Sequence, residues 1–112
     1  MVKDPQIFLE QIKDFCDKIT LHTQGKTLAD FKSDELLQYA IIKILEMIGE
    51  ACNKLETDFH STHPDIPWRS IIGMRNRTVH DYWDINLPIV WKTVTTRVPE
   101  LRDQIAKLID SK

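Results

Sequence analysis

A short segment of this chain combines an arginine, a histidine and a tyrosine within eight residues. Arg75, His80 and Tyr82 follow an apolar run that ends at Gly73. A guanidinium holds a phosphate through a planar fork of donors, an imidazole transfers protons near neutral pH, and a phenol offers a hydroxyl group. Cleavage of an RNA backbone without a metal ion requires groups of these kinds. Because such side chains are common, their surroundings must carry the interpretation.

The spacing of the arginine and the histidine restricts how they could act together. On a straight α-helix, five residues correspond to about 140°, so the two side chains would not face the same way. Either the helix ends or bends between Arg75 and His80, or two copies of the chain bring one subunit's arginine to the other's histidine. Tyr82 would face the same side as Arg75 if the helix continued.

Basic residues are concentrated around this segment. The sequence of 112 residues has a net charge of −2, yet residues 66–80 contain Arg69, Arg75 and Arg77 and no acidic residue. A small basic region on an acidic body suits a few phosphate contacts rather than a long nucleic-acid footprint. The alternative is a solvated helix face with three ordinary arginines, and charge alone favours that alternative.

All of the elements that must position these residues are predicted to be helices. Only three glycines and five prolines interrupt the chain, apolar residues recur at helical spacing, and no segment shows the alternation of a hairpin. The first predicted helix runs from Asp4 or Pro5 to about Thr23, and a loop or single turn follows over residues 27–32. The second helix has its N-cap at Ser33 and ends at Asp58 or His60. The third runs from Pro67 to between His80 and Trp83, and the fourth continues from an N-cap at Asn86.

Apolar stripes on these helices predict an all-α, up-and-down four-helix bundle. Pro99 lies inside the last stripe, so we expect a kink near Arg97–Val98. The long second helix has two stripes and should contact neighbours on two sides. The predicted core consists of Phe8, Ile12, Phe15, Ile19 and His22; Leu37, Ile41, Ile44, Ile48, Ala51 and Leu55, with a second stripe of Leu36, Ala40, Leu45, Cys52 and Phe59; Trp68, Ile71, Ile72 and Val79; and Trp91, Val94, Val98, Leu101, Ile105 and Leu108.

Length and composition indicate a single domain over residues 1–112. The hydrophobic share of 42% and the charged share of 29% are typical of a globular protein. Cys16 and Cys52 lie on apolar stripes and are expected to be reduced core thiols. No apolar run approaches the ~20 residues of a membrane span, and the first residues do not begin a signal peptide, so we expect a cytoplasmic protein.

The remaining histidines and tryptophans have ordinary interpretations. His60 and His63 have a spacing that can bind metal, but no cysteine or acidic cluster completes a site, so we expect two solvated loop histidines and no metal. Trp68, Trp83 and Trp91 could stack on nucleobases. Burial in the core or in an interface is the preferred interpretation, at least for Trp68 and Trp91.

Three pieces of the sequence together resemble the HepT toxins of the HEPN superfamily. They are Ile48-Gly49-Glu50-Ala51, the run from Ile66-Pro67-Trp68 to Met74-Arg75-Asn76, and His80-Asp81-Tyr82. The resemblance covers essentially the whole chain, and the Arg-x4-His pattern, weak by itself, is strong in this setting. It implies a four-helix HEPN fold and a homodimeric, metal-independent endoribonuclease without a cofactor, acting as the toxin of a type VII toxin–antitoxin pair.

The resemblance also implies roles for individual residues. Arg75, Asn76 and His80 match the family's catalytic motif, which two subunits bring together in a shared cleft. Tyr82 matches the tyrosine to which the partner antitoxin, a minimal nucleotidyltransferase of the MntA type, transfers AMP from ATP. A bulky anion there would block the RNA site by its volume and its charge.

The residues themselves suit this chemistry. The ribose 2′-hydroxyl would attack the adjacent phosphorus, leaving a 2′,3′-cyclic phosphate and a free 5′-hydroxyl. His80 would act as general base or acid, since a histidine pKa of ~6.5 suits proton transfer at neutral pH. Arg75 would hold the non-bridging oxygens. Asn76 would donate to the phosphate or fix the tautomer of His80.

Several assignments stay open from the sequence. Arg69 and Arg77 are candidate RNA contacts, and Glu50 either supports Arg75 or faces solvent. In a purely structural interpretation, Arg75 or Arg77 pairs with a carboxylate such as Glu46 or Glu50, and His80 caps the C-terminus of a helix. A catalytically inactive HEPN bundle that binds a nucleotide or scaffolds the nucleotidyltransferase is the alternative function.

Overall fold

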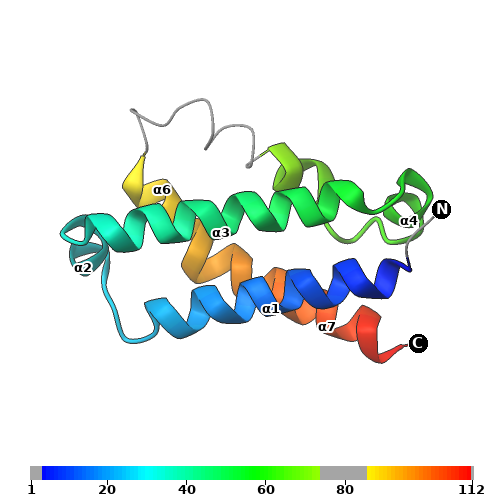
Figure 1. The fold of residues 1–112 in the computed structure, drawn as a ribbon, viewed down its shortest axis with the longest axis horizontal. Coiled ribbons are helices and arrows are strands. Elements are labelled where there is room, and N and C mark those ends of the chain that lie inside the picture. Colours follow the sequence, from blue (N-terminus) through cyan, green and yellow to red (C-terminus); the bar gives the residue numbers. More distant parts are fainter. Residues whose placement is uncertain (1–3, 74–85, 112) are drawn as a thin grey trace.

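The chain forms an all-helical bundle, which confirms the predicted fold class (Figure 1). The computed structural model describes residues 4–73 and 86–111, and no strand occurs within these ranges. Residues 68–73 are helical as well. The other elements are α1 (Pro5–Thr23), α2 (Leu28–Lys32), α3 (Glu35–Lys54), α4 (Thr57–Thr62), α6 (Leu87–Lys92), a π-helical segment η1 (Thr93–Arg97) and α7 (Val98–Asp110).

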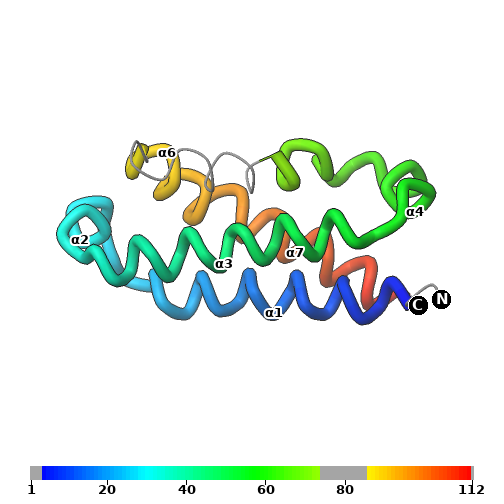
Figure 2. The backbone as a smooth tube through the Cα atoms, turned by 45° about the horizontal axis from the view of Figure 1, so that its top comes forward, coloured from blue at the N-terminus to red at the C-terminus, as the bar shows by residue number. Residues whose placement is uncertain are grey.

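Successive segments alternate in direction, as expected for an up-and-down bundle, because residues 68–73 run back between α3 and the stretch from α6 to α7 (Figure 1). Helix α1 packs against both α3 and α7, and Figure 2 shows α1 and α3 running side by side in opposite directions. Residues 68–73 and α6 lie on the opposite side of α3 from α1 in both views. From α6 the chain returns through η1 to α7, which ends near the start of α1. None of the helices in the described part of the chain is long and apolar enough to cross a membrane.

Most of the predicted core is buried, with corrections at three positions. His22 is exposed, and Thr23 is buried in its place, where its hydroxyl donates to the Ile19 carbonyl at 2.7 Å. Leu36 is 78% exposed and Ala40 is also exposed. The second stripe assigned to this helix was wrong because Leu36 and Leu45 are nine residues apart, which corresponds to about 180° on a helix. Residues not predicted but fully buried are Leu9, Phe31 and Ile66.

The start of α3 lies one residue later than predicted. Ser33 closes α2, where its hydroxyl donates to the Asp30 carbonyl at 3.0 Å. Asp34 is the N-cap of α3, and its carboxylate accepts a hydrogen bond from the Leu37 N–H at 3.0 Å. Ser33 and Asp34 could each have capped α3, but Ser33 serves as the C-cap of α2. Helix α2 lies in the segment predicted as a loop or a single turn.

The long helix ends earlier than predicted, at Lys54 rather than near His60. Leu55 adopts an extended backbone conformation, with ψ at 138°, and is only 4% exposed. The chain then turns into α4, which places the His60 ring nitrogen 3.0 Å from the Cys52 carbonyl in the last turn of α3. Burial of Leu55 and this additional contact to a terminal carbonyl favour the early ending.

The kink expected near Arg97–Val98 takes the form of a π-helical turn. The Val98 N–H bonds to the Thr93 carbonyl, five residues back. Pro99 has no N–H, and in α geometry its ring would crowd the Thr95 carbonyl four residues earlier, so wider hydrogen bonding just before the proline relieves the clash. The Thr95 hydroxyl donates to the Trp91 carbonyl at 3.0 Å.

Other predicted helix ends are confirmed. Asn86 caps α6 by accepting a hydrogen bond from the Ile89 N–H at 3.1 Å, and Pro88 lies in the first turn. Gly25, with φ at 77°, follows the end of α1. This left-handed conformation favours glycine over residues with a Cβ atom.

Candidate functional site

The residues predicted to carry the chemistry fall in the segment between the two described ranges. Arg75, Asn76, Arg77, His80 and Tyr82 all lie outside the described residues, as do Val79 and Trp83. The structure describes how the chain leads into this segment at Gly73 and out of it at Asn86. The described parts of the chain on either side of the segment therefore form its entry and its exit.

The entry to the segment is anchored by Trp68. Its side chain is 5% exposed, and its indole N–H donates to the His63 carbonyl at 3.0 Å. The His60 ring stacks on it at 4.8 Å, and the Phe59 ring meets it edge-on at 5.9 Å. The helix of residues 68–73 thus starts from a fixed aromatic cluster, consisting of Phe59, His60, His63 and Trp68.

The same cluster corrects the interpretation of the two histidines. His60 lies in α4 and His63 directly follows it, and both are half-buried rather than solvated in a loop. The His63 ring is 4.5 Å from the Phe59 ring. The structure therefore assigns both rings to packing. Within the two described ranges, no group of three or more His, Cys, Asp or Glu side chains is arranged to hold a metal ion.

The exit from the segment is anchored by α6. Asn86 caps this helix, and Val90 is buried against the core. The Trp91 ring stacks on the fully buried Phe31 ring with 5.1 Å between centroids. The prediction that Trp68 and Trp91 serve packing is confirmed.

A cleft of about 50 Å³ separates residues 67–71 from η1 and α7. Its floor is apolar and includes Leu45, Ile48 and Leu101. Polar side chains from both walls line it as well, namely Ser70, Thr93, Arg97, Glu100 and Gln104. On its other side, the helix of residues 68–73 borders an open hollow that is lined by Arg69, Asn53, Thr57 and His60. Pro67 and Ser70 line both depressions, which therefore adjoin.

Two arginines at these depressions have no acidic partner among the described residues. Arg69 and Arg97 are exposed, and neither forms a salt bridge with a carboxylate of residues 4–73 or 86–111. Glu50 is exposed on α3, next to the buried Gly49. Glu46 lies 3.9 Å from Lys43 within the same helix. Arg69 was a candidate from the sequence, whereas Arg97 was missed, because only the cleft distinguishes it from other surface cations.

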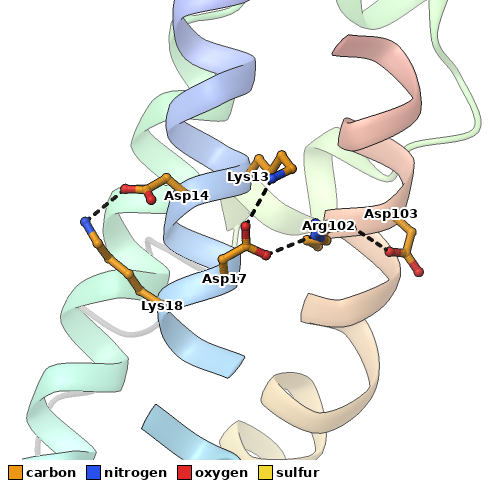
Figure 3. A network of polar contacts seen from close by, with 6 residues as sticks. All are labelled: Lys13, Asp14, Asp17, Lys18, Arg102 and Asp103. Carbon is orange, nitrogen blue, oxygen red and sulfur yellow. Dashed lines mark hydrogen bonds and ion pairs between the residues drawn. The ribbon is translucent and has the colours of Figure 1, made fainter. Parts of the chain in front are cut away.

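Away from the cleft, a network of ion pairs joins α1 to α7 (Figure 3). The Arg102 guanidinium donates to the Asp17 carboxylate at 3.0 Å, and the Lys13 ammonium lies 3.2 Å from the same group. Partial burial alone would raise the pKa of Asp17, but the hydrogen bonds from Arg102 and Lys13 outweigh it and hold the pKa below its usual value. This network has a structural role in the packing of two helices.

Both cysteines are free and buried, as predicted. Burial raises the pKa of the Cys16 thiol to about 12, and it also raises the pKa of the Cys52 thiol. Thiols that remain protonated are poor nucleophiles. Neither cysteine is therefore a candidate for nucleophilic catalysis.

Comparison with known proteins gives a consistent family assignment. A family model described as Ribonuclease HepT-like matches residues 9–108. A protein of Caldanaerobacter subterraneus, provisionally named an RNase, is 34% identical over 96% of this chain and 96% of its own length. A protein of Thermococcus cleftensis, provisionally named ribonuclease HepT, is 35% identical over 96% of this chain and 98% of its own length. A protein of Methanocaldococcus jannaschii, provisionally named an RNase, is 35% identical over 96% of this chain and 88% of its own length. No solved structure gives a significant match to the chain.

Proposed function

This chain belongs to the HepT-like ribonuclease family, and we propose that it is a metal-independent endoribonuclease that acts as the toxin of a type VII toxin–antitoxin pair. The observation that carries this proposal is the family match over residues 9–108, because that range includes the complete motif from Arg75 to Tyr82. The relatives named as RNases support an activity on RNA. We further propose that residues 1–112 act as one HEPN-type domain and that the protein works in the cytoplasm.

In the proposed reaction, Arg75 and His80 act on one phosphodiester. His80 takes the proton from the ribose 2′-hydroxyl or gives one to the leaving 5′-oxygen, and the new bond from the 2′-oxygen to phosphorus displaces that oxygen. Arg75 holds the non-bridging oxygens and stabilises the charge that builds up on them. Asn76 donates to the phosphate or orients His80. The products are a 2′,3′-cyclic phosphate and a 5′-hydroxyl.

The proposed active form is a homodimer. Arg75 and His80 are five positions apart, a spacing that turns their side chains apart on a straight helix. A second subunit would remove that restriction by supplying the histidine that faces the first subunit's arginine. Arg77 and Arg69 would bind neighbouring phosphates, and Glu50 would orient Arg75.

The proposed control is modification of Tyr82. A partner nucleotidyltransferase of the MntA type would transfer AMP from ATP to the phenol oxygen, releasing pyrophosphate. The added phosphate would repel the RNA backbone from the neighbouring Arg75 and His80. Co-production with the partner should increase the intact mass by one or more AMP units, and Tyr82→Phe should abolish the increase. An unchanged increase in the Tyr82→Phe protein would contradict the assignment.

The nuclease assignment is tested by comparing single variants on a purified RNA substrate. Arg75→Ala and His80→Ala should each lower the cleavage rate by at least about 100-fold, since acid–base and phosphate-stabilising groups contribute at that level. Lys107→Ala is the matched control, because it removes an exposed cation from α7 without altering the motif. Full cleavage by His80→Ala would reject the role of that histidine. Wild-type protein that leaves RNA intact but accepts AMP would support the alternative of an inactive nucleotide-binding or scaffold protein.

A further inference from the structure

We propose that Arg97 is an additional RNA-positioning residue, which binds a substrate phosphate at the mouth of the cleft between residues 67–71 and η1. The proposal rests on the proposed ribonuclease function. It adds a contact from a part of the chain that lies outside the family motif. The described residues alone define this site.

The first argument is the position of Arg97 relative to the helix that leads into the motif segment. One wall of the cleft consists of residues 67–71, which lead directly into the segment that starts at Met74, and Arg97 lies on the opposite wall with Thr93. The π-helical turn just before Pro99 ends at Arg97. Such turns interrupt regular helix geometry and often occur at functional sites. RNA that lies along the helix of residues 68–73 would therefore meet this guanidinium across the cleft.

The charge state of Arg97 is the second argument. Its guanidinium is exposed and has no salt bridge to a carboxylate of the described ranges, whereas Arg102, five residues later, is bonded to both Asp17 and Asp103. An unpaired guanidinium keeps all its donors available for a phosphate. The sequence around it is also basic, since residues 66–99 contain five basic and two acidic side chains in a chain of net charge −2.

The size of the cleft determines which part of RNA it contacts. A volume of about 50 Å³ holds only a few water molecules, so a nucleobase cannot be enclosed. Leu45 and Ile48 on its floor are each only 1% exposed and offer little surface to a ligand. Arg97 should consequently read the backbone, and its contribution should not depend on base identity.

Glu100 should affect RNA binding in the opposite direction to Arg97. This carboxylate lines the same cleft three residues after Arg97, on a neighbouring position of the helix surface. It repels a phosphate bound to Arg97. Removal of the negative charge should therefore strengthen RNA binding, while removal of Arg97 should weaken it.

The test measures RNA affinity separately from cleavage. All proteins carry His80→Ala, so that the substrate stays intact, and binding of a fluorescent single-stranded RNA is followed by anisotropy over roughly 50 to 200 mM salt. Arg97→Ala should weaken binding by about tenfold and reduce the slope of log K against log salt by about 0.7, the value for one phosphate contact on a single strand. Glu100→Gln should tighten binding. Lys107→Ala should change neither quantity, and circular dichroism checks that each variant is folded.

The outcomes separate this inference from the proposed function. If wild-type protein cleaves RNA but Arg97→Ala binds it with the affinity and salt slope of Lys107→Ala, the role of Arg97 is rejected and the nuclease assignment stands. If wild-type protein cleaves RNA and Arg97→Ala loses affinity for only one RNA sequence, the backbone contact is rejected in favour of base recognition. If the protein neither binds nor cleaves RNA, both proposals fail.

Discussion

At the scale of single residues, Trp68 does most to fix the chain as it enters the motif. Its ring is enclosed by Phe59 and His60, and its N–H is satisfied by the His63 carbonyl. A buried tryptophan generally needs such a partner, because an unpaired polar group in the core is costly. The helix of residues 68–73 is therefore held at its first turn by both packing and a hydrogen bond.

Replacement of this tryptophan separates the two contributions. Trp68→Phe should lower the free energy of unfolding by about 2 kcal/mol, because the His63 carbonyl loses its donor and the smaller ring leaves space. Trp91→Phe is the matched control, since Trp91 stacks on Phe31 but no hydrogen bond of its indole N–H is recorded in the described ranges. Urea denaturation of both proteins measures the difference. Equal destabilisation would show that the hydrogen bond contributes nothing.

The sequence predicted Trp68 as a core residue but not its neighbours. His60 and His63 were expected to be solvated because polar residues near prolines are typical of loops. Their burial depends on α4, which turns back onto α3 and brings His60 to the Cys52 carbonyl. That contact joins residues eight positions apart across a helix end, and apolar periodicity carries no signal for it.

At the scale of elements, the two possible caps at the start of α3 can be distinguished experimentally. Asp34→Ala should lower the free energy of unfolding by about 1 kcal/mol, because its carboxylate accepts the Leu37 N–H and carries negative charge at a helix N-terminus. Ser33→Ala should have a smaller effect, since its hydroxyl bonds only to the exposed end of α2. Thermal or urea unfolding gives both values. A larger loss for Ser33→Ala would restore the cap assigned from the sequence.

The helices themselves were predictable, and their interruptions only in part. Apolar spacing predicted α1, α3 and α7, because each buries one continuous stripe, but it placed the end of α3 too late. Pro99 signalled the irregularity near Arg97–Val98, but a missing N–H does not specify whether the helix breaks, kinks or widens. Leu36 and Ala40 were wrongly predicted to be buried, because residues on opposite faces of one helix were assigned to a single stripe.

The candidate site was predictable only through its family resemblance. Arg75, His80 and Tyr82 form a recognisable pattern in one continuous stretch, so the sequence was sufficient to nominate them. Arg97 was not predicted as a site residue, because it lines the cleft opposite a helix nearly 30 residues earlier in the chain. Contacts of this kind come from tertiary structure and leave no local pattern.

At the scale of the whole molecule, the Asp17–Arg102 pair ties the first long helix to the last. Asp17→Asn should lower the free energy of unfolding at about pH 7 by no more than about 1 kcal/mol, because both side chains are more than one third exposed. The pKa of Asp17 is lowered in the folded state, so its contribution is present above its unfolded pKa of ~3.9 and is lost as the pH falls through the folded value.

The difference between wild type and Asp17→Asn should therefore be present at neutral pH and should shrink below about pH 4. Urea unfolding at several pH values measures it. Asp14→Asn is the control, since among the described residues Asp14 pairs only with Lys18 of the same helix, at 2.9 Å. A difference that grows toward acid pH would contradict the assigned direction of the pKa shift.

The central claim is that this helical protein cuts RNA through its own side chains, with His80 moving the proton and Arg75 holding the phosphate. The most direct test is to incubate the purified protein with end-labelled RNA in excess EDTA and to identify the new ends by mass spectrometry. Wild-type protein should give fragments with 2′,3′-cyclic phosphate and 5′-hydroxyl ends, and His80→Ala should give none. Cleavage that disappears in EDTA, or fragments that carry 5′-phosphate ends, would contradict it.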